Sequence, residues 1–280
     1  MKDQSSITAL MSAFGRAFHA ENEAHPVFRD GLARELMTAE EYAAVQGYVL
    51  QGAQFFEPET DPAAQEPKAL LRRLVNTQLA PSPLCRAAYT EQALKAAAQT
   101  GTRQYVILGA GLDTFAFREP AFLAEGRVFE VDHPLTQADK LARIDRAGWK
   151  RPEGLAFVPV DFTRDSLAER LCSAGFDPAA RAFFSWLGVT YYLPAEAVEE
   201  TLAALSGLCA AGSALVFDYP DEGFFSAGER RVQNTILQKH GFRIGALLTP
   251  EDIQRDVIDR AGGALKAFEH VNYCLAIREK

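Results

Sequence analysis

Apolar residues follow two different patterns along the chain, and the change comes near residue 100. In 7–54 and 68–98, apolar positions and alanines recur at helical spacing, and Thr38 with Glu41 three residues later predicts the N-cap of a helix. After residue 100, apolar runs of strand length alternate with stretches compatible with helices, at 105–108, 128–131, 155–160, 182–187 and 213–218. This alternation predicts an α/β fold with a doubly wound, mostly parallel sheet.

The last part of the chain departs from this alternation. Thr249 followed by Pro250 predicts a helix start, and the helix should run to about Ala261, after which two glycines break it. The apolar and β-prone residues of 265–277 suit a final strand, which is expected to pair with a shorter one near 242–244. The sheet is therefore predicted to have seven strands.

An apolar strand ending in Gly109-Ala110-Gly111 is the most informative local motif. A side chain at either glycine would obstruct both a tight turn and a ligand, and the amides beyond the turn are expected to face that ligand. The motif taken alone is also compatible with an ordinary turn after a strand. A dinucleotide fingerprint would add a third glycine at position 114, where this chain has Thr114. The turn therefore predicts a cofactor cradle and disfavours a dinucleotide.

The two strands that follow the glycine turn both end in an aspartate. Asp132 lies 21 residues after Gly111, where a carboxylate can reach a ribose diol, and Asp161 with Phe162 supplies an acceptor and an aromatic face for adenine. Each aspartate by itself also suits a turn or a helix cap. Three successive strand ends of this kind, at one edge of a parallel sheet, favour a shared site for adenosine.

A nucleoside without a pyrophosphate requires fewer glycines, and S-adenosylmethionine is a ligand of this kind. Its amino-acid tail carries a carboxylate that needs a cationic partner. Arg86 lies just before the helix that leads into the first strand, and its planar guanidinium could hold that carboxylate with two hydrogen bonds. An ordinary surface ion pair is the alternative role for this arginine.

Composition narrows the class of partner and the compartment. The 280 residues are 48% hydrophobic and 24% charged with a net charge of −8, so no broad cationic surface is expected for nucleic acid or an anionic membrane. The polar and charged residues among the first 18 suit neither a signal peptide nor a membrane span, and a cytoplasmic protein is expected. The four cysteines are scattered singly, so they predict no metal site and are expected to be small buried residues.

Five segments carry a family resemblance: RAAYTE at 86–91, QYVILGAGLDT at 104–114, FEVDHP at 129–134, VPVDF at 158–162 and SWLGVTYYL at 185–193. With these segments the chain resembles the bacterial S-adenosylmethionine-dependent O-methyltransferases related to leucine carboxyl methyltransferase, which are often attached to polyketide biosynthesis. The resemblance covers most of the chain and implies a Rossmann-like methyltransferase core over residues 101–280. Residues 1–100 would form a helical lid that caps the substrate.

The resemblance also implies roles for single residues. Arg86 would hold the methionine carboxylate, Gly109 would contact the methionyl part, and Asp132 would take the ribose hydroxyls. Adenine would lie against the aspartate and the aromatic ring that follow the third strand. The implied donor site consists of Arg86, Gly109, Gly111, Asp113, Asp132, Asp161, Phe162 and Leu187.

One position departs from the family pattern beside the reaction centre. Protein-directed members carry a glutamate after the tryptophan of the fourth strand, whereas this chain has Leu187 after Trp186. The change removes a carboxylate from the reaction side. A protein C-terminal leucine is therefore disfavoured as the substrate, and a small-molecule acceptor is expected.

Methyl transfer from a sulfonium is an in-line displacement, so the protein can act mainly by alignment, without a metal or a covalent nucleophile. A carboxylate acceptor needs no base, whereas a hydroxyl acceptor benefits from one. The catalytic candidates are His19 and His25 in the helical region and Tyr191 and Tyr192 after the fourth strand. Each histidine is equally compatible with a solvated or core position.

The resulting expectation is an S-adenosylmethionine-dependent O-methyltransferase that acts on a carboxylate or hydroxyl oxygen of a small molecule, such as a polyketide-like metabolite. Two alternatives stay open from the residues alone. A catalytically idle S-adenosylmethionine-binding module would keep the donor site and lack transfer. A nicotinamide-dependent oxidoreductase would share the strand and turn, although the third glycine of its fingerprint is missing.

Overall fold

The structure is a computed structural model, and it describes residues 7–59, 61, 64–118, 120–161, 164–220, 230–263 and 265–279. Its N-terminal region is helical, as predicted. The helices are α1 (Ile7–Asn22), α2 (Ala39–Gln51), α3 (Ala53–Phe56), α4 (Pro67–Leu74) and α5 (Pro81–Gln99), with a 3-10 turn at Gly31–Arg34 and a π-helical turn at Val75–Leu79. Among the described residues, no helix combines the length and apolar character needed to cross a bilayer.

The start of α2 confirms the predicted N-cap. The backbone N–H of Glu41 donates to Thr38 Oγ1 at 3.1 Å, and the backbone N–H of Thr38 donates to Glu41 Oε2 at 2.9 Å. This reciprocal pair satisfies two amides that the first turn of a helix otherwise leaves without partners.

The predicted seven-stranded sheet is confirmed. Its strands are β1 (Gln104–Leu108), β2 (Arg127–Asp132), β3 (Leu155–Pro159), β4 (Ala182–Trp186), β5 (Ala214–Pro220), β6 (Phe242–Leu248) and β7 (Val271–Arg278), in the order β3-β2-β1-β4-β5-β7-β6. Only β7 runs antiparallel to its neighbours β5 and β6. The last strand begins at Val271, later than the expected residue 265.

The remaining helices flank the sheet. They are α6 (Pro134–Ala147), α7 (Leu167–Ser173), α8 (Ala195–Leu208), α9 (Arg230–Lys239) and α10 (Pro250–Ile253), and short 3-10 turns follow β1 and β4 at Phe115–Arg118, Ala121–Leu123 and Thr190–Tyr192. Thr249 caps α10 as predicted. The helical conformation continues after α10 through a π turn and a 3-10 turn to Ala261. Gly262, with a left-handed φ of 68°, ends it.

Both faces of the sheet are buried, as expected of a mostly parallel sheet between helices. Phe184 of β4 packs with the α7 and α8 side, whereas its neighbour Phe183 packs on the opposite face with Leu94 of α5. Since successive strand residues point to opposite faces, adjacent aromatic residues fill two separate cores. Helix α5 of the N-terminal region thus packs directly on one face of the sheet.

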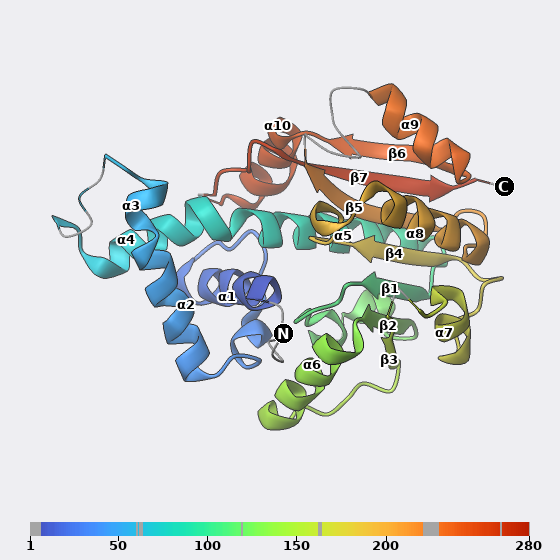
Figure 1. The fold of residues 1–280 in the computed structure, drawn as a ribbon, viewed down its shortest axis with the longest axis horizontal. Helices are drawn as coiled ribbons and strands as arrows, with labels where there is room; N and C mark the ends of the chain where they lie inside the picture. The colour runs from blue at the N-terminus through green and yellow to red at the C-terminus, as the bar shows by residue number, and fades with distance from the viewer. Residues whose placement is uncertain are drawn as a thin grey trace.

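Helices α1 and α2 stand at the end of the sheet toward which the parallel strands run. Figure 1 shows the arrowheads of β1 and β4 pointing to these helices. A third apolar cluster, which includes Phe14, Leu74, Ile258 and Tyr273, joins the helical region to the C-terminal part of the chain. The helical region therefore lies where loops from several strand ends meet, which is where α/β sheets bind ligands.

The four cysteines are separate, with free thiols. Cys85 and Cys274 are buried, whereas Cys172 is exposed and Cys209 is half-buried. The expectation that all four are buried is therefore wrong for Cys172, which lies on the outer side of the short helix α7.

Candidate functional site

A cavity of about 1350 Å³ opens at the carboxyl edge of the sheet. Its wall comes from α1, α5, the loops after β1, β2 and β4, the first turn of α7, and the chain around Phe268 and Val271. Many residues predicted from the sequence meet in this wall: Arg86, Gly109, Gly111, Asp113, Asp132, Leu187, Tyr191 and Tyr192. The segments that supply them are far apart in the chain, so the fold brings the predicted site together.

The two glycines of the β1 turn are required by close neighbours. Both adopt left-handed conformations, with φ of 70° at Gly109 and 47° at Gly111. A Cβ at Gly109 would lie 2.5 Å from Val189 Cγ2, and one at Gly111 would lie 3.2 Å from the Cβ of Ala9 in α1. The loop after β4 and the first turn of α1 therefore approach this turn so closely that only glycine fits at the two positions.

The amides of the turn itself have partners within the protein. The backbone N–H groups of Gly109 and Ala110 both donate to Val131 O, at 2.8 and 3.1 Å, and that of Gly111 donates to Asp132 Oδ2 at 2.6 Å. These amides bind the end of β2, so they do not face a ligand. The turn offers a ligand a glycine surface instead of a row of donors.

Asp132 is held in one orientation by the backbone. Its Oδ2 accepts from Gly111 N and its Oδ1 accepts from His133 N at 2.7 Å. Burial raises the pKa of Asp132, and these two backbone hydrogen bonds oppose the rise. Each carboxylate oxygen keeps a second lone pair, which a ribose hydroxyl can use. His133 itself caps α6 through Nδ1, which accepts from Leu135 N at 3.3 Å.

A buried ion pair lies between β2 and α6, two residues before Asp132 on the strand. The sequence analysis did not predict it. Lys140 of α6 donates to Glu130 of β2, and both side chains are almost completely buried. Burial raises the pKa of Glu130 to about 7, although the nearby Lys140 ammonium opposes the rise. A charged residue inside an apolar strand was the signal for this pair, since such a residue is rarely buried without a partner.

Arg86 lines the cavity and is paired from behind. Its Nη1 lies 3.2 Å from Oδ2 of Asp218, a fully buried carboxylate at the end of β5. The partner is therefore an interior residue, which differs from the surface ion pair considered as an alternative. Sequence reasoning missed Asp218, although the fifth predicted strand ends in an aspartate just as the second and third do.

A second network ties α1 to the glycine turn. Arg16 of α1 donates through Nε to Asp30 Oδ2 at 2.8 Å and through Nη2 to Leu112 O at 2.7 Å. Asp30 Oδ1 in turn accepts from Thr114 Oγ1 at 2.7 Å. Burial alone would raise the pKa of Asp30, but the Arg16 and Arg118 guanidinium groups outweigh it and lower that pKa. The threonine in place of a third glycine thus anchors α1.

The predicted adenine side is only partly placed. Asp161 accepts from Arg164 Nε at 2.8 Å, and it precedes the cavity-wall residues Asp165 and Ser166 without being one of them. Phe162 lies outside the described residues. The adenine contacts therefore stay a prediction.

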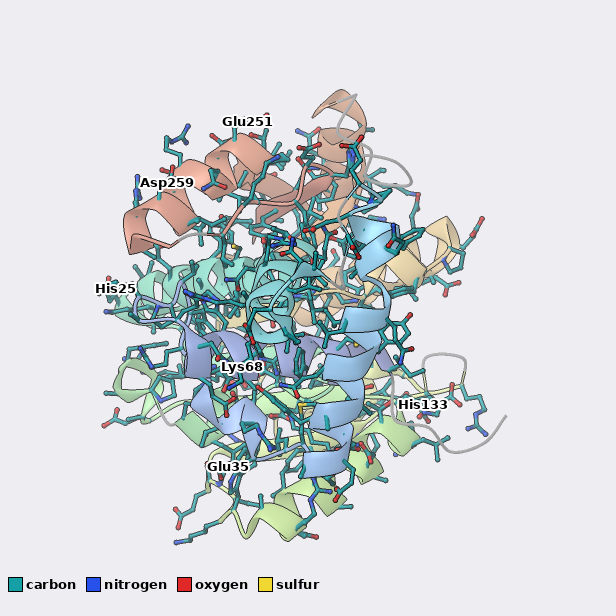
Figure 2. All side chains as sticks on the ribbon, turned by 90° about the vertical axis from the view of Figure 1, so that its left-hand side faces the viewer. His25, Glu35, Lys68, His133, Glu251 and Asp259 are labelled. Carbon is teal, nitrogen blue, oxygen red and sulfur yellow. The ribbon has the colours of Figure 1, made fainter. Side chains whose placement is uncertain are left out.

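The two predicted histidines lie away from the cavity wall. His19 is buried within the helical region, its Nε2 accepts from Val27 N at 3.2 Å, and burial lowers its pKa. His25 is exposed, and Figure 2 shows it at the opposite edge from His133, which does line the cavity. Neither geometry supports a role as general base.

Tyr191 and Tyr192 both line the cavity, in different settings. Tyr191 donates from its hydroxyl to Asp218 Oδ2 at 3.2 Å. Burial and the adjacent Asp218 carboxylate raise the pKa of Tyr191 far above neutral pH, so the phenol stays protonated and can orient a ligand without acting as a phenolate base. Tyr192 is 69% exposed and stands at the rim.

The fold resembles that of a solved methyltransferase structure. A candidate methyltransferase from Thermobifida fusca superposes with a TM-score of 0.52 at 14% identity, over 83% of this chain and 94% of the other. At that identity the likeness shows the fold alone.

Sequence comparison places the chain in a family. A profile of leucine carboxyl methyltransferase matches residues 9–206. Two similar proteins are candidate S-adenosyl-L-methionine-dependent methyltransferases. YktD of Bacillus subtilis is 35% identical over 99% of both chains, and a Mycobacterium marinum protein is 31% identical over 86% of this chain and 73% of its own length. This chain belongs to the leucine carboxyl methyltransferase family, which confirms the resemblance and disfavours the oxidoreductase alternative.

Proposed function

We propose that the chain is an S-adenosylmethionine-dependent O-methyltransferase that methylates a hydroxyl group of a small, largely apolar molecule. The observation that carries this proposal is the single cavity that joins the β1 turn and the β2 end to α1 and α5. At about 1350 Å³ it exceeds the roughly 300–1000 Å³ of an ordinary small-ligand site, so a donor and an acceptor can share it. In this proposal, residues 1–100 form the lid over the acceptor.

The donor would lie across the strand ends. Arg86 would hold the methionine carboxylate, the surface of Gly109 and Gly111 would accept the methionyl chain, and Asp132 would bind the ribose. Asp161 and Phe162 would hold adenine, as the family pattern implies. S-adenosylmethionine would supply the methyl group and leave as S-adenosylhomocysteine, while the protein residues orient the two substrates. The proton of the acceptor hydroxyl would pass to solvent at the cavity rim, where Tyr192 is exposed.

The charges in the cavity wall favour a neutral hydroxyl over a carboxylate as the acceptor. Among the described residues of the wall, each arginine already has an internal partner: Arg16 pairs with Asp30, Arg86 with Asp218, and Arg118 with Glu91. The described wall contains no lysine. If the donor carboxylate takes the remaining donors of Arg86, an anionic acceptor would find no unpaired arginine or lysine in the described wall, and only the donor sulfonium would balance its charge.

Calorimetry and transfer assays test the proposal together. S-adenosylhomocysteine is expected to bind, and NAD is not. Radiolabelled donor should then methylate the hydroxyl member of matched aromatic pairs, such as a naphthol compared with the corresponding naphthoate. Transfer to the naphthoate alone would overturn the hydroxyl assignment. Binding of S-adenosylhomocysteine without transfer to any of a broad set of phenols, alcohols and acids would favour the idle binding module.

A further inference from the structure

Asp218 occupies an unusual position for a charged residue. It lies near the end of β5 opposite Tyr273 of β7, and its side chain is completely buried. A buried carboxylate destabilises the fold unless it is paired and hydrogen-bonded. Among the described residues, Arg86 is the cation within ion-pair distance of it.

Three donors, one from α5 and two from the loop after β4, converge on this carboxylate. Gly188 N donates to Oδ1 at 2.6 Å, while Arg86 Nη1 and the Tyr191 hydroxyl each donate to Oδ2 at 3.2 Å. Both oxygens are therefore occupied, and the carboxylate cannot rotate without losing a partner. Its orientation is set by the loop after β4.

The same contacts restrict the guanidinium of Arg86. Gly188 has a left-handed φ of 67°, and a Cβ there would overlap the guanidinium, so the arginine packs against bare backbone. Arg86 Nη2 lies 3.5 Å from Ser12 Oγ of α1 on another side. The arginine side chain is 17% exposed, and it reaches the cavity wall. The Arg86 guanidinium is thus fixed by contacts within the protein while the side chain also lines the cavity.

We propose that Asp218 is a positioning residue that orients the Arg86 guanidinium toward the carboxylate of the methyl donor. The inference rests on the proposed donor site. A guanidinium presents five N–H donors in a planar fork, and the contact with Asp218 uses one of them, on Nη1. This contact fixes the plane of the fork, so the remaining N–H groups keep a set direction, which a bidentate contact with the donor tail requires.

The competing explanation is that Asp218 only fastens β5 to the loop after β4. That role would support every part of the cavity equally. The proposed role concerns the amino-acid tail alone, because Arg86 has no part in holding the nucleoside. Two ligands separate the explanations: S-adenosylhomocysteine carries the tail carboxylate, and 5′-methylthioadenosine has the same nucleoside without it.

The experiment compares the affinities of both ligands for wild type and Asp218→Asn by calorimetry. The asparagine keeps an acceptor for Gly188 N and turns an N–H₂ group toward Arg86. S-adenosylhomocysteine is expected to bind at least about tenfold more weakly, since a hydrogen bond to a charged group is lost, while the affinity for 5′-methylthioadenosine stays unchanged. Asp139→Asn, which breaks an ion pair with Arg143 on α6, is the matched control and should change neither affinity.

A double variant keeps the test decisive if Asp218→Asn alone fails to fold. Arg86→Met with Asp218→Asn has no buried charge at the site and should bind S-adenosylhomocysteine as weakly as Arg86→Met. A further loss in the double variant, or an equal loss for both ligands in Asp218→Asn, would overturn the positioning role. If the wild-type protein binds S-adenosylhomocysteine no more tightly than 5′-methylthioadenosine, the result would contradict the proposed contact between Arg86 and the donor carboxylate, which is part of the proposed function.

Discussion

Three aspartates lie at the ends of parallel strands β2, β3 and β5, and each has a different environment. Asp132 is held by two backbone amides, Asp161 pairs with the exposed Arg164, and Asp218 is buried against Arg86. The same local sequence feature therefore gives a carboxylate in the cavity wall, a pair with an exposed arginine and a buried ion pair. What separates them is the depth of the strand end within the sheet, since β3 is an edge strand and β5 is internal.

At the residue scale, Asp132→Ala should weaken binding of S-adenosylhomocysteine and also lower stability. The substitution leaves the part-buried amide of Gly111 without its acceptor, which costs about 1 kcal/mol, and the exposed amide of His133 can bond to water instead. Asp161→Ala is the comparison for stability alone, because its pair with the exposed Arg164 contributes only about 0–1 kcal/mol, whereas the side chain belongs to the proposed adenine site. Calorimetry and urea unfolding measure the two effects, and unchanged affinity in Asp132→Ala would show that the ribose lies elsewhere.

The Glu130 carboxyl predicts a pH dependence of stability. Because burial raises its pKa to about 7 from the ordinary 4.5, the folded state favours the protonated form, so this contribution is complete below pH 4.5 and is lost as the pH rises through 7. Glu130→Gln cannot ionise. Its free energy of unfolding, measured relative to wild type, should therefore increase between pH 5 and pH 8. Parallel pH profiles for the two proteins would contradict this assignment.

At the scale of elements, helix α1 is attached to the glycine turn after β1, as the proposed lid over the site requires. Ala9 of the helix lies against Gly111 of the turn, and Arg16 donates a hydrogen bond to Leu112 O just after it. Asp30, in the chain after α1, accepts a hydrogen bond from Thr114. Most of these contacts are polar and directional. They place α1 against the proposed methionyl end of the donor site, so a change in α1 is expected to reach donor binding.

Asp30→Asn tests this coupling against a cap variant. The loss of the ion pair with Arg16 should loosen α1, increase amide exchange over residues 7–22 and weaken the binding of S-adenosylhomocysteine. Thr38→Ala removes the cap of α2 and should cost about 1 kcal/mol of stability without changing that affinity. Hydrogen exchange and calorimetry measure both variants. Equal affinities for Asp30→Asn and wild type would mean that α1 is not coupled to the donor.

At the scale of the whole molecule, the cavity is shared between the sheet domain and the helical region. Neither part encloses it alone, because α1 and α5 form one side and the strand-end loops form the other. Ligand binding should therefore stabilise both parts together. The net charge of −8 adds no attraction for an anionic acceptor, in agreement with the paired arginines of the wall.

Saturation with S-adenosylhomocysteine should raise the melting temperature and protect α1 from amide exchange. At a ligand concentration 100 times the dissociation constant, the stabilisation is about 2.7 kcal/mol, which shifts the melting temperature of a chain of this size by several degrees. NAD at the same concentration is the control and should cause no shift. A rise in melting temperature without protection of residues 7–22 would separate donor binding from the proposed lid.

Much of the fold could be predicted from short segments. The strand at 105–108 and the caps at Thr38 and Thr249 depend on neighbours within a few residues. Contacts with distant partners could not be predicted in this way. The amides of the glycine turn bind β2, and the two histidines are kept outside the cavity wall by the packing of the helical region.

The sequence by itself determined the order of helices and strands, the sharp turn at Gly109 and Gly111, and the residue types that gather at the strand ends. Only the tertiary structure decided which charges meet. Arg86 and Asp218 are 132 residues apart, and their pairing depends on β5 lying beside β4 in the sheet. Periodicity and turns arise from local backbone geometry, whereas a buried ion pair forms only where the completed fold excludes water from both groups.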